Sequence, residues 1–104
     1  MLRKKEQNET SVIVNPLYEQ HKKLLDEIHE TYIQKNQAYG NSFGDTYKKL
    51  GIISAVTRIT DKYNRIVNLV THTDVDKGDE SLRDSLCDLC NYAAMTVMEI
   101  DREK

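Results

Sequence analysis

The stretch from Ile52 to Val70, IISAVTRITDKYNRIVNLV, decides the fold class of this chain. Its apolar residues recur in alternating steps of four and three, which is the spacing of one face of a helix. The residues that follow this spacing are Ile52, Val56, Ile59, Tyr63, Ile66 and Val70. The spacing predicts a long helix with a packing seam along one side.

Upstream of this stretch, the spacing predicts a second long helix from Pro16 to about Ala38. Asn15 supplies an N-cap before Pro16, and Gly40 is well placed as the C-terminal stop. One face of this helix is mostly apolar and includes two polar residues, His21 and Lys35. Its residues are Leu17, His21, Leu24, Leu25, Ile28, Tyr32, Lys35 and Tyr39. A short helix is expected from Asp45 to Leu50, with Asp45 as its cap and Gly51 at its end.

Downstream, a third long helix is expected from near residues 79–81 to about Glu99, after a loop over residues 71–78. Acidic residues at its start suit the positive end of a helix. One apolar stripe comprises Leu82, Leu86, Leu89, Ala93, Val97 and Ile100, and a second one comprises Cys87, Ala94 and Met98. A helix that is apolar on two sides is buried on two sides, so we expect a second copy of the chain as cover, with the short helix or the N-terminal arm as alternatives.

The elements together predict an all-α protein, a helical hairpin or bundle of three long helices and one short helix, completed by oligomerisation. With 104 residues, one Pro and four Gly, the chain is expected to form a single domain over residues 15–104. Residues 1–14 are predicted to be a mobile arm, because most of them are polar and show no period.

Charge and hydropathy exclude several classes of function. The formal net charge of -2 provides no overall field for a nucleic-acid backbone, so strong nucleic-acid binding is not expected. No run of ~18 apolar residues exists that could cross a membrane, and polar sequence follows Met1 where a signal peptide would be apolar, so we expect a cytoplasmic protein. Cys87 and Cys90 lack the further ligands of a structural zinc site and are expected to pack as small hydrophobic residues.

The first cluster with chemical potential lies in QKNQAYGNSF, residues 34–43. Lys35 shares the apolar face of its helix, Asn36 lies at the edge of that face, and Tyr39 precedes the terminal glycine. An ammonium and a carboxamide beside a helical core can hold a phosphate and read the edge of a base. The alternative is a lysine that extends its ammonium to water at a helix end.

The second cluster is cationic. Arg58, Lys62 and Arg65 follow each other at spacings of four and three along one flank of the seam. Three cations on one flank can converge on a polyphosphate. The alternative is a solvated flank whose cations form ion pairs.

The third cluster is acidic and lies in DESLRDSLCDLCNYA, which begins at residue 79. Asp84 and Asp88 are one turn apart, with Tyr92 following. Two carboxylates at this spacing can hold Mg²⁺, which would in turn bridge phosphates. An acidic face in contact with water is the alternative.

The motifs KNQAYGNSF, RITDKYNRIVNL and DESLRDSLCDLCNYAAMTVMEID occur in this order in the chain. Together they resemble the phage-associated nucleotide modification associated domain family, over roughly residues 20–101. A more distant resemblance is to the MazG-like all-α nucleoside triphosphate pyrophosphohydrolases, which hold magnesium through EExxE and ExxD motifs. Residues 26–30, DEIHE, are similar to the first motif, with Asp in place of the first Glu. Glu80 with Asp84, or Asp84 with Asp88, is similar to the second motif, with a spacing of four in place of three.

We expect a nucleotide-binding protein, and a host-cell cytoplasmic one if a phage encodes it. The nucleotide, cyclic or linear, is expected to be a DNA-modification precursor or a defence signal that the protein sequesters. The expected ligand-binding residues are Lys35, Asn36, Tyr39, Arg58, Lys62 and Arg65. One alternative is a magnesium-dependent pyrophosphohydrolase that uses Asp84 and Asp88 as ligands and Glu27 or Glu30 as a further ligand or base. Another is a helical module that binds a protein.

Overall fold

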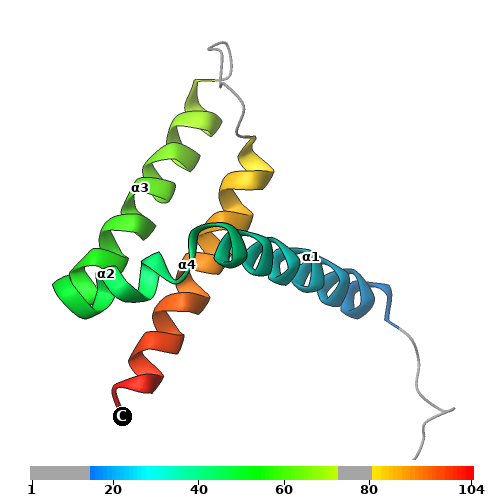
Figure 1. The fold of residues 1–104 in the computed structure, drawn as a ribbon. Helices are drawn as coiled ribbons and strands as arrows, with labels where there is room; N and C mark the ends of the chain where they lie inside the picture. Colours follow the sequence, from blue (N-terminus) through cyan, green and yellow to red (C-terminus); the bar gives the residue numbers. More distant parts are fainter. Residues whose placement is uncertain (1–14, 73–80) are drawn as a thin grey trace, which may run out of the picture.

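The computed structural model describes residues 15–72 and 81–104, and within these ranges the chain is all-α. It forms four helices, which are α1 (Pro16–Tyr39), α2 (Ser42–Leu50), α3 (Ile52–Thr71) and α4 (Leu82–Arg102) (Figure 1). This confirms the predicted fold class and the succession of three long helices and one short helix. The predicted N-terminal arm and most of the predicted loop lie outside the described residues.

Both ends of α1 follow from local sequence. The Asn15 side chain accepts a hydrogen bond from the backbone N–H of Leu17 at 2.9 Å, which satisfies one of the free donors at the helix start. At the other end, Gly40 has a φ of 71° and its N–H donates to the carbonyl of Asn36. Because few residues other than glycine adopt this backbone conformation, α1 stops there.

The start of α2 differs from the prediction. The helix begins at Ser42, and Asn41 caps it by accepting a hydrogen bond from the N–H of Gly44 at 3.3 Å. Asp45 lies in the first turn and is not the cap. The carboxamide of Asn41 reaches its partner because Gly44 has no side chain, since a Cβ there would lie 2.5 Å from Asn41 Nδ2.

The helices α3 and α4 form an antiparallel hairpin with the largest helix–helix contact in the described structure (Figure 1). α4 begins one residue after Ser81, later than predicted, and extends to Arg102, beyond the expected end near Glu99. Its start is a capping box, in which the Ser81 hydroxyl accepts from the N–H of Asp84 while the Asp84 carboxylate accepts from the N–H of Ser81.

Few large apolar side chains of α3 and α4 are buried. Ala55 and Leu69 of α3 are buried, and so are the polar residues Ser85, Thr96 and Glu99 of α4. The predicted seam of α3 is instead largely exposed, with only two of its six residues partly buried, Ile59 and Ile66. α3 is therefore rotated about its axis so that its basic flank, formed by Arg58, Lys62 and Arg65, faces α4. This flank lies next to the seam.

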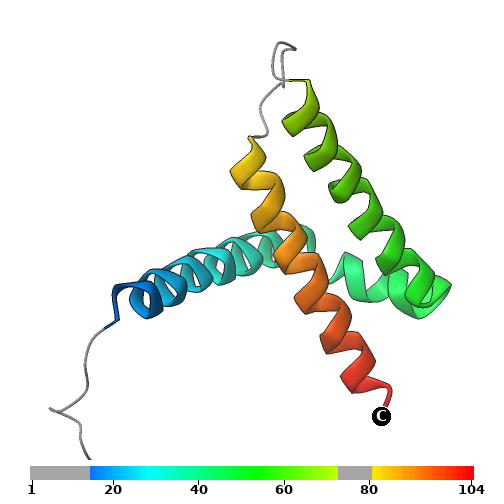
Figure 2. The same cartoon turned by 180° about the vertical axis from the view of Figure 1, so that it is seen from behind.

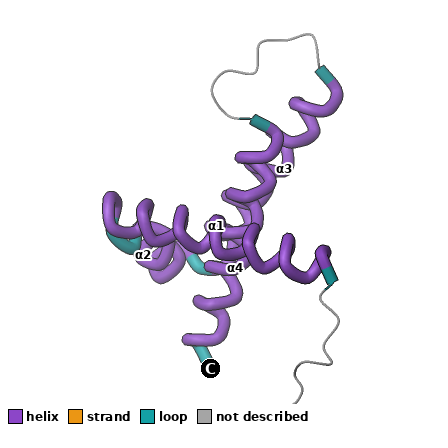
Figure 3. Tube along the Cα trace, turned by 90° about the vertical axis from the view of Figure 1, so that its right-hand side faces the viewer, coloured by secondary structure: helices purple, strands orange, loops and turns teal. Residues whose placement is uncertain are grey.

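The other two helices attach to α4 through specific polar contacts. α1 runs across α4 (Figure 3), and the Asn91 side chain donates to the carbonyl of Ile28 at 3.1 Å. The hydroxyl of Tyr47 in α2 donates to Glu103 at 3.2 Å, and burial and the nearby Glu103 carboxylate raise the pKa of Tyr47. Among the described helices, none combines the length and the apolar character that a bilayer span requires.

Candidate functional site

A cavity of about 340 Å³ lies where the C-terminal end of α1 and the turn into α2 meet α3 and α4. Its walls carry aromatic rings, carboxamides and charged groups. The rings are those of Tyr32, Tyr39, Phe43 and Tyr92, the carboxamides are those of Asn36, Asn41 and Asn91, and the charged groups are those of Lys35, Arg58 and Asp88. The volume falls at the small end of the range for ligand pockets, which suits one small molecule.

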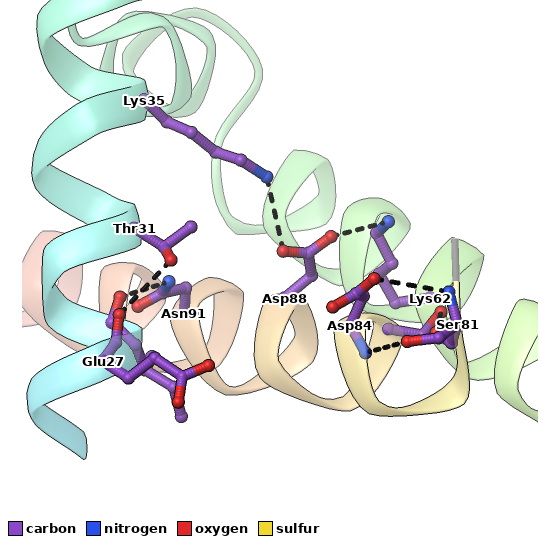
Figure 4. Close-up of polar contacts among 10 residues, drawn as sticks. Glu27, Thr31, Lys35, Lys62, Ser81, Asp84, Asp88 and Asn91 are labelled. Carbon is purple, nitrogen blue, oxygen red and sulfur yellow. Dashed lines mark hydrogen bonds and ion pairs between the residues drawn. The ribbon is translucent and has the colours of Figure 1, made fainter. Parts of the chain in front are cut away.

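Charged groups from three helices meet at one side of the cavity (Figure 4). The carboxylate of Asp88 in α4 lies 3.3 Å from the ammonium of Lys35 in α1 and 3.1 Å from that of Lys62 in α3. Arg58 also lines the cavity, so its wall carries two cations, Lys35 and Arg58, and one carboxylate. The cavity lining therefore has a net positive charge, which favours a phosphate or another anion.

The two lysines differ in their freedom to move. The side chain of Lys62 is 18% exposed and that of Asp88 is 19% exposed, whereas that of Lys35 is 59% exposed. Lys62 and Asp88 thus form the fixed part of the group, and Lys35 can turn toward a ligand without losing packing.

The cavity wall also carries aromatic rings. The rings of Phe43 and Tyr92 are nearly parallel, with centroids 6.1 Å apart and 20° between their planes. Tyr39, also at the cavity wall, is 76% exposed. Aromatic faces of this kind stack on nucleobases, and a carboxamide such as that of Asn36 can both donate to and accept from a base edge.

The structure brings four of the six predicted ligand-binding residues to this cavity, namely Lys35, Asn36, Tyr39 and Arg58. Lys62 does not line the cavity but pairs with Asp88 behind its wall. Arg65 lies one turn further along α3 and is half-buried, outside the cavity lining. The three cations of α3 therefore do not converge on one point.

Several residues of the cavity wall were not expected from the sequence. Phe43, Asn91 and Tyr92 were not predicted as ligand-binding residues, and Asp88 was predicted only as a metal ligand. Tyr92 and Asp88 are one turn apart on α4, so the helical spacing that joined Asp84 to Asp88 also reaches Tyr92. Nothing in the sequence indicates that Phe43 stacks on Tyr92, because the two lie on different helices.

The two predicted metal ligands both bind groups of the chain itself. Asp84 is the acidic member of the capping box at the start of α4, and Asp88 pairs with two ammonium groups. Within residues 15–72 and 81–104, no three or more His, Cys, Asp or Glu side chains lie together as a possible metal site.

A second ion pair joins α1 to α4 beside a neighbouring hollow. Both terminal nitrogens of the Arg83 guanidinium donate to the carboxylate of Glu27, at 2.7 and 3.0 Å. The hydrogen bonds and the charge of Arg83 hold the pKa of Glu27 below its usual value. Cys87 lines the same hollow, and burial raises the pKa of its thiol. Glu27 is a possible ligand or base in the hydrolase alternative, and in this structure its carboxylate is paired with the Arg83 guanidinium.

Comparison with known families identifies the region that carries these features. The family described as nucleotide modification associated domain 1 matches residues 35–100, which include all of α2 and α3 and most of α4. Neither the curated proteins nor the solved structures contain a significant match to the chain. The match begins at Lys35, covers every cavity residue except Tyr32 and extends over more than half of the sequence. The chain therefore belongs to the nucleotide modification associated domain 1 family.

Proposed function

We propose that the cavity binds a single nucleotide, with a phosphate at Lys35 and Arg58 and the base against the aromatic rings. The observation that carries this proposal is the composition of one cavity of about 340 Å³, which brings cations from two helices together with a stacked aromatic pair. Carboxamides in the same wall supply donors and acceptors for the base. The family description, which refers to nucleotide modification, is consistent with this ligand class.

The phosphate interaction would rest on an exchange of partners. Lys35 pairs with Asp88 at 3.3 Å on the exposed side, whereas the Lys62 pair at 3.1 Å is mostly shielded from water. A phosphate can attract Lys35 away from Asp88 while Lys62 keeps the carboxylate neutralised. Charge-assisted hydrogen bonds to a phosphate are about twice as strong as neutral ones, which favours the exchange.

In this function the protein binds or sequesters the nucleotide, either as a precursor for DNA modification or as a nucleotide signal. Sequestration needs affinity alone. A magnesium-dependent pyrophosphohydrolase would have to free Asp88 from two ammonium groups, Asp84 from its cap and Glu27 from Arg83. For this reason the geometry favours a binding protein over the hydrolase.

The test is calorimetry with a panel of mono-, tri- and cyclic nucleotides, with and without Mg²⁺. Arg58→Ala removes a charged donor worth about 1.5–3 kcal/mol, so the affinity should fall roughly tenfold or more. Lys23→Ala removes an exposed cation of α1 that does not line the cavity and is the matched control. Unchanged affinity in Arg58→Ala for every nucleotide that binds, or no binding at all, would rule out the proposal.

Asp88→Asn separates the two functions. Because it removes a negative charge beside the phosphate, a binding protein should hold the nucleotide as well or better. A hydrolase that uses this carboxylate for Mg²⁺ should lose turnover. Chromatography of the nucleotide after incubation with the unsubstituted protein and Mg²⁺ completes the test, since recovery of a monophosphate and pyrophosphate would support the hydrolase.

A further inference from the structure

The side of the α3–α4 hairpin that faces away from α1 carries large apolar side chains. In Figure 2, α4 lies in front of α1, and no described helix covers α4 or α3 from this side. The apolar residues on it are between 44% and 59% exposed and come from both helices. They are Ile52, Val56, Tyr63 and Val70 of α3, and Leu86 and Val97 of α4.

Helical geometry places these residues on one common face. Tyr63 follows Lys62, which points to Asp88, so Tyr63 lies about 100° around α3 from the helix contact. Leu86 follows the buried Ser85, so Leu86 also lies about 100° from the helix contact, around α4. When two antiparallel helices pack side by side, the residues that follow the contact residues of each helix lie on the same side of the pair. Asn91, which binds α1, lies about 140° from Leu86 around α4, on the other side.

The α3 half of this face is nearly free of charge. Among the exposed residues of α3, only Asp61 is charged, although 31% of the residues in the whole chain are charged. On α4 the exposed charged residues Arg83 and Asp101 lie about 60° around the helix from Leu86, at the edge of the face. Loss of charge together with aliphatic and tyrosine side chains distinguishes the core of a protein interface from other surface. An uncharged apolar face is complementary to itself, since two copies related by a twofold axis bring no like charges together.

The described helices expose enough surface for a dimer. The accessible surface is 7610 Å², and the radius of gyration is 18.1 Å. One subunit of a stable homodimer buries about 800 to 2,500 Å², so an interface on the apolar face would take up only part of this surface.

We propose that this face is the interface of a twofold-symmetric homodimer, in which α3 and α4 of one copy pack against α3 and α4 of the other. The interface covers the seam of α3 that the single chain leaves exposed. The cavity stays accessible, because it lies where α1 crosses the hairpin on the opposite side. The inference does not depend on which ligand the cavity binds.

The first test is light scattering of the full chain at tens of micromolar, which should give twice the mass of 12.1 kDa. Val56→Glu and Val97→Glu should each give a monomer with retained helical circular dichroism. Thr57→Glu adds the same charge to an exposed position of α3 outside the apolar face and should remain dimeric. A monomeric unsubstituted protein would overturn the proposal.

A second measurement covers the case in which the glutamate variants fail to fold. Isotope-filtered nuclear Overhauser spectra of a mixture of labelled and unlabelled unsubstituted protein should show contacts between copies for Tyr63, Leu86 and Val97. Contacts between copies that involve only α1, or contacts of these residues with the N-terminal arm of the same copy alone, would contradict the proposed interface.

Discussion

At the scale of single residues, charge pairs between helices set the positions of the cavity walls. The Asp88 carboxylate pairs with one ammonium from α1 and one from α3, and the Glu27 carboxylate accepts from both terminal nitrogens of Arg83. These contacts join residues that are far apart in the chain, such as Lys35 and Asp88. They explain why charged groups occupy the inner faces of helices in a protein with a small apolar core.

The Glu27–Arg83 pair makes a pH-dependent contribution to stability. Since the pKa of Glu27 is lowered in the folded chain, its contribution is present above the unfolded pKa and is lost as the pH falls through the folded value. Arg83→Gln should therefore raise the pKa of Glu27 and flatten the loss of stability on acidification. Carboxyl ¹³C titration by NMR measures the first effect, and urea unfolding between neutral and acidic pH measures the second.

Lys104→Gln is the control for this experiment, because it removes an exposed cation that pairs with Asp101 on the far end of α4. It should leave the titration of Glu27 unchanged. A Glu27 pKa that stays the same in Arg83→Gln would show that the ion pair does not form in solution.

At the scale of elements, two glycines end helices and set the direction of the next one. Gly51 has a φ of 78° and a ψ of -169°, and a Cβ added there would meet nothing within 4 Å. Glycine is therefore required at position 51 only because of the backbone conformation, and not because of a close contact. Gly40 has similar angles at the end of α1 but also lines the cavity.

Gly51→Ala should therefore destabilise the fold by about 1–3 kcal/mol, the cost of a non-glycine residue in this region, while nucleotide affinity stays the same. Urea unfolding gives the first quantity and calorimetry gives the second. Thr57→Ala, at an exposed helical position, is the control and should change stability by less than about 0.5 kcal/mol. An equally stable Gly51→Ala protein would mean that α2 and α3 meet at a different angle in solution.

At the scale of the whole molecule, the helices form an open arrangement measuring 49 × 42 × 23 Å. If the apolar face of α3 and α4 is a dimer interface, folding is coupled to association and stability depends on concentration. A hundredfold dilution of the protein should lower the unfolding temperature by several degrees. In Val56→Glu the unfolding temperature should be lower and independent of concentration. A concentration-independent unfolding temperature of the unsubstituted protein would indicate a self-sufficient monomer.

The sequence by itself determined the helices and most of their ends, because these depend on interactions within a few residues. The apolar spacing of α3, the cap at Asn15 and the glycines at 40 and 51 are all local signals, and the structure agrees with them. The cap of α2 was placed wrongly at Asp45, since both Asn41 and Asp45 are good caps and only the close approach of Asn41 to Gly44 distinguishes them.

Only the tertiary structure decided which face of each helix is inside. The apolar seam of α3 is mostly exposed in the single chain, and the basic flank faces α4, where Lys62 meets Asp88. Likewise, Lys35, Asn36, Tyr39 and Arg58 line one cavity with Tyr92, whereas Arg65 does not. Helical spacing specifies which residues share a face, but the rotation of a helix about its axis depends on contacts with distant segments, and those contacts assemble the cavity.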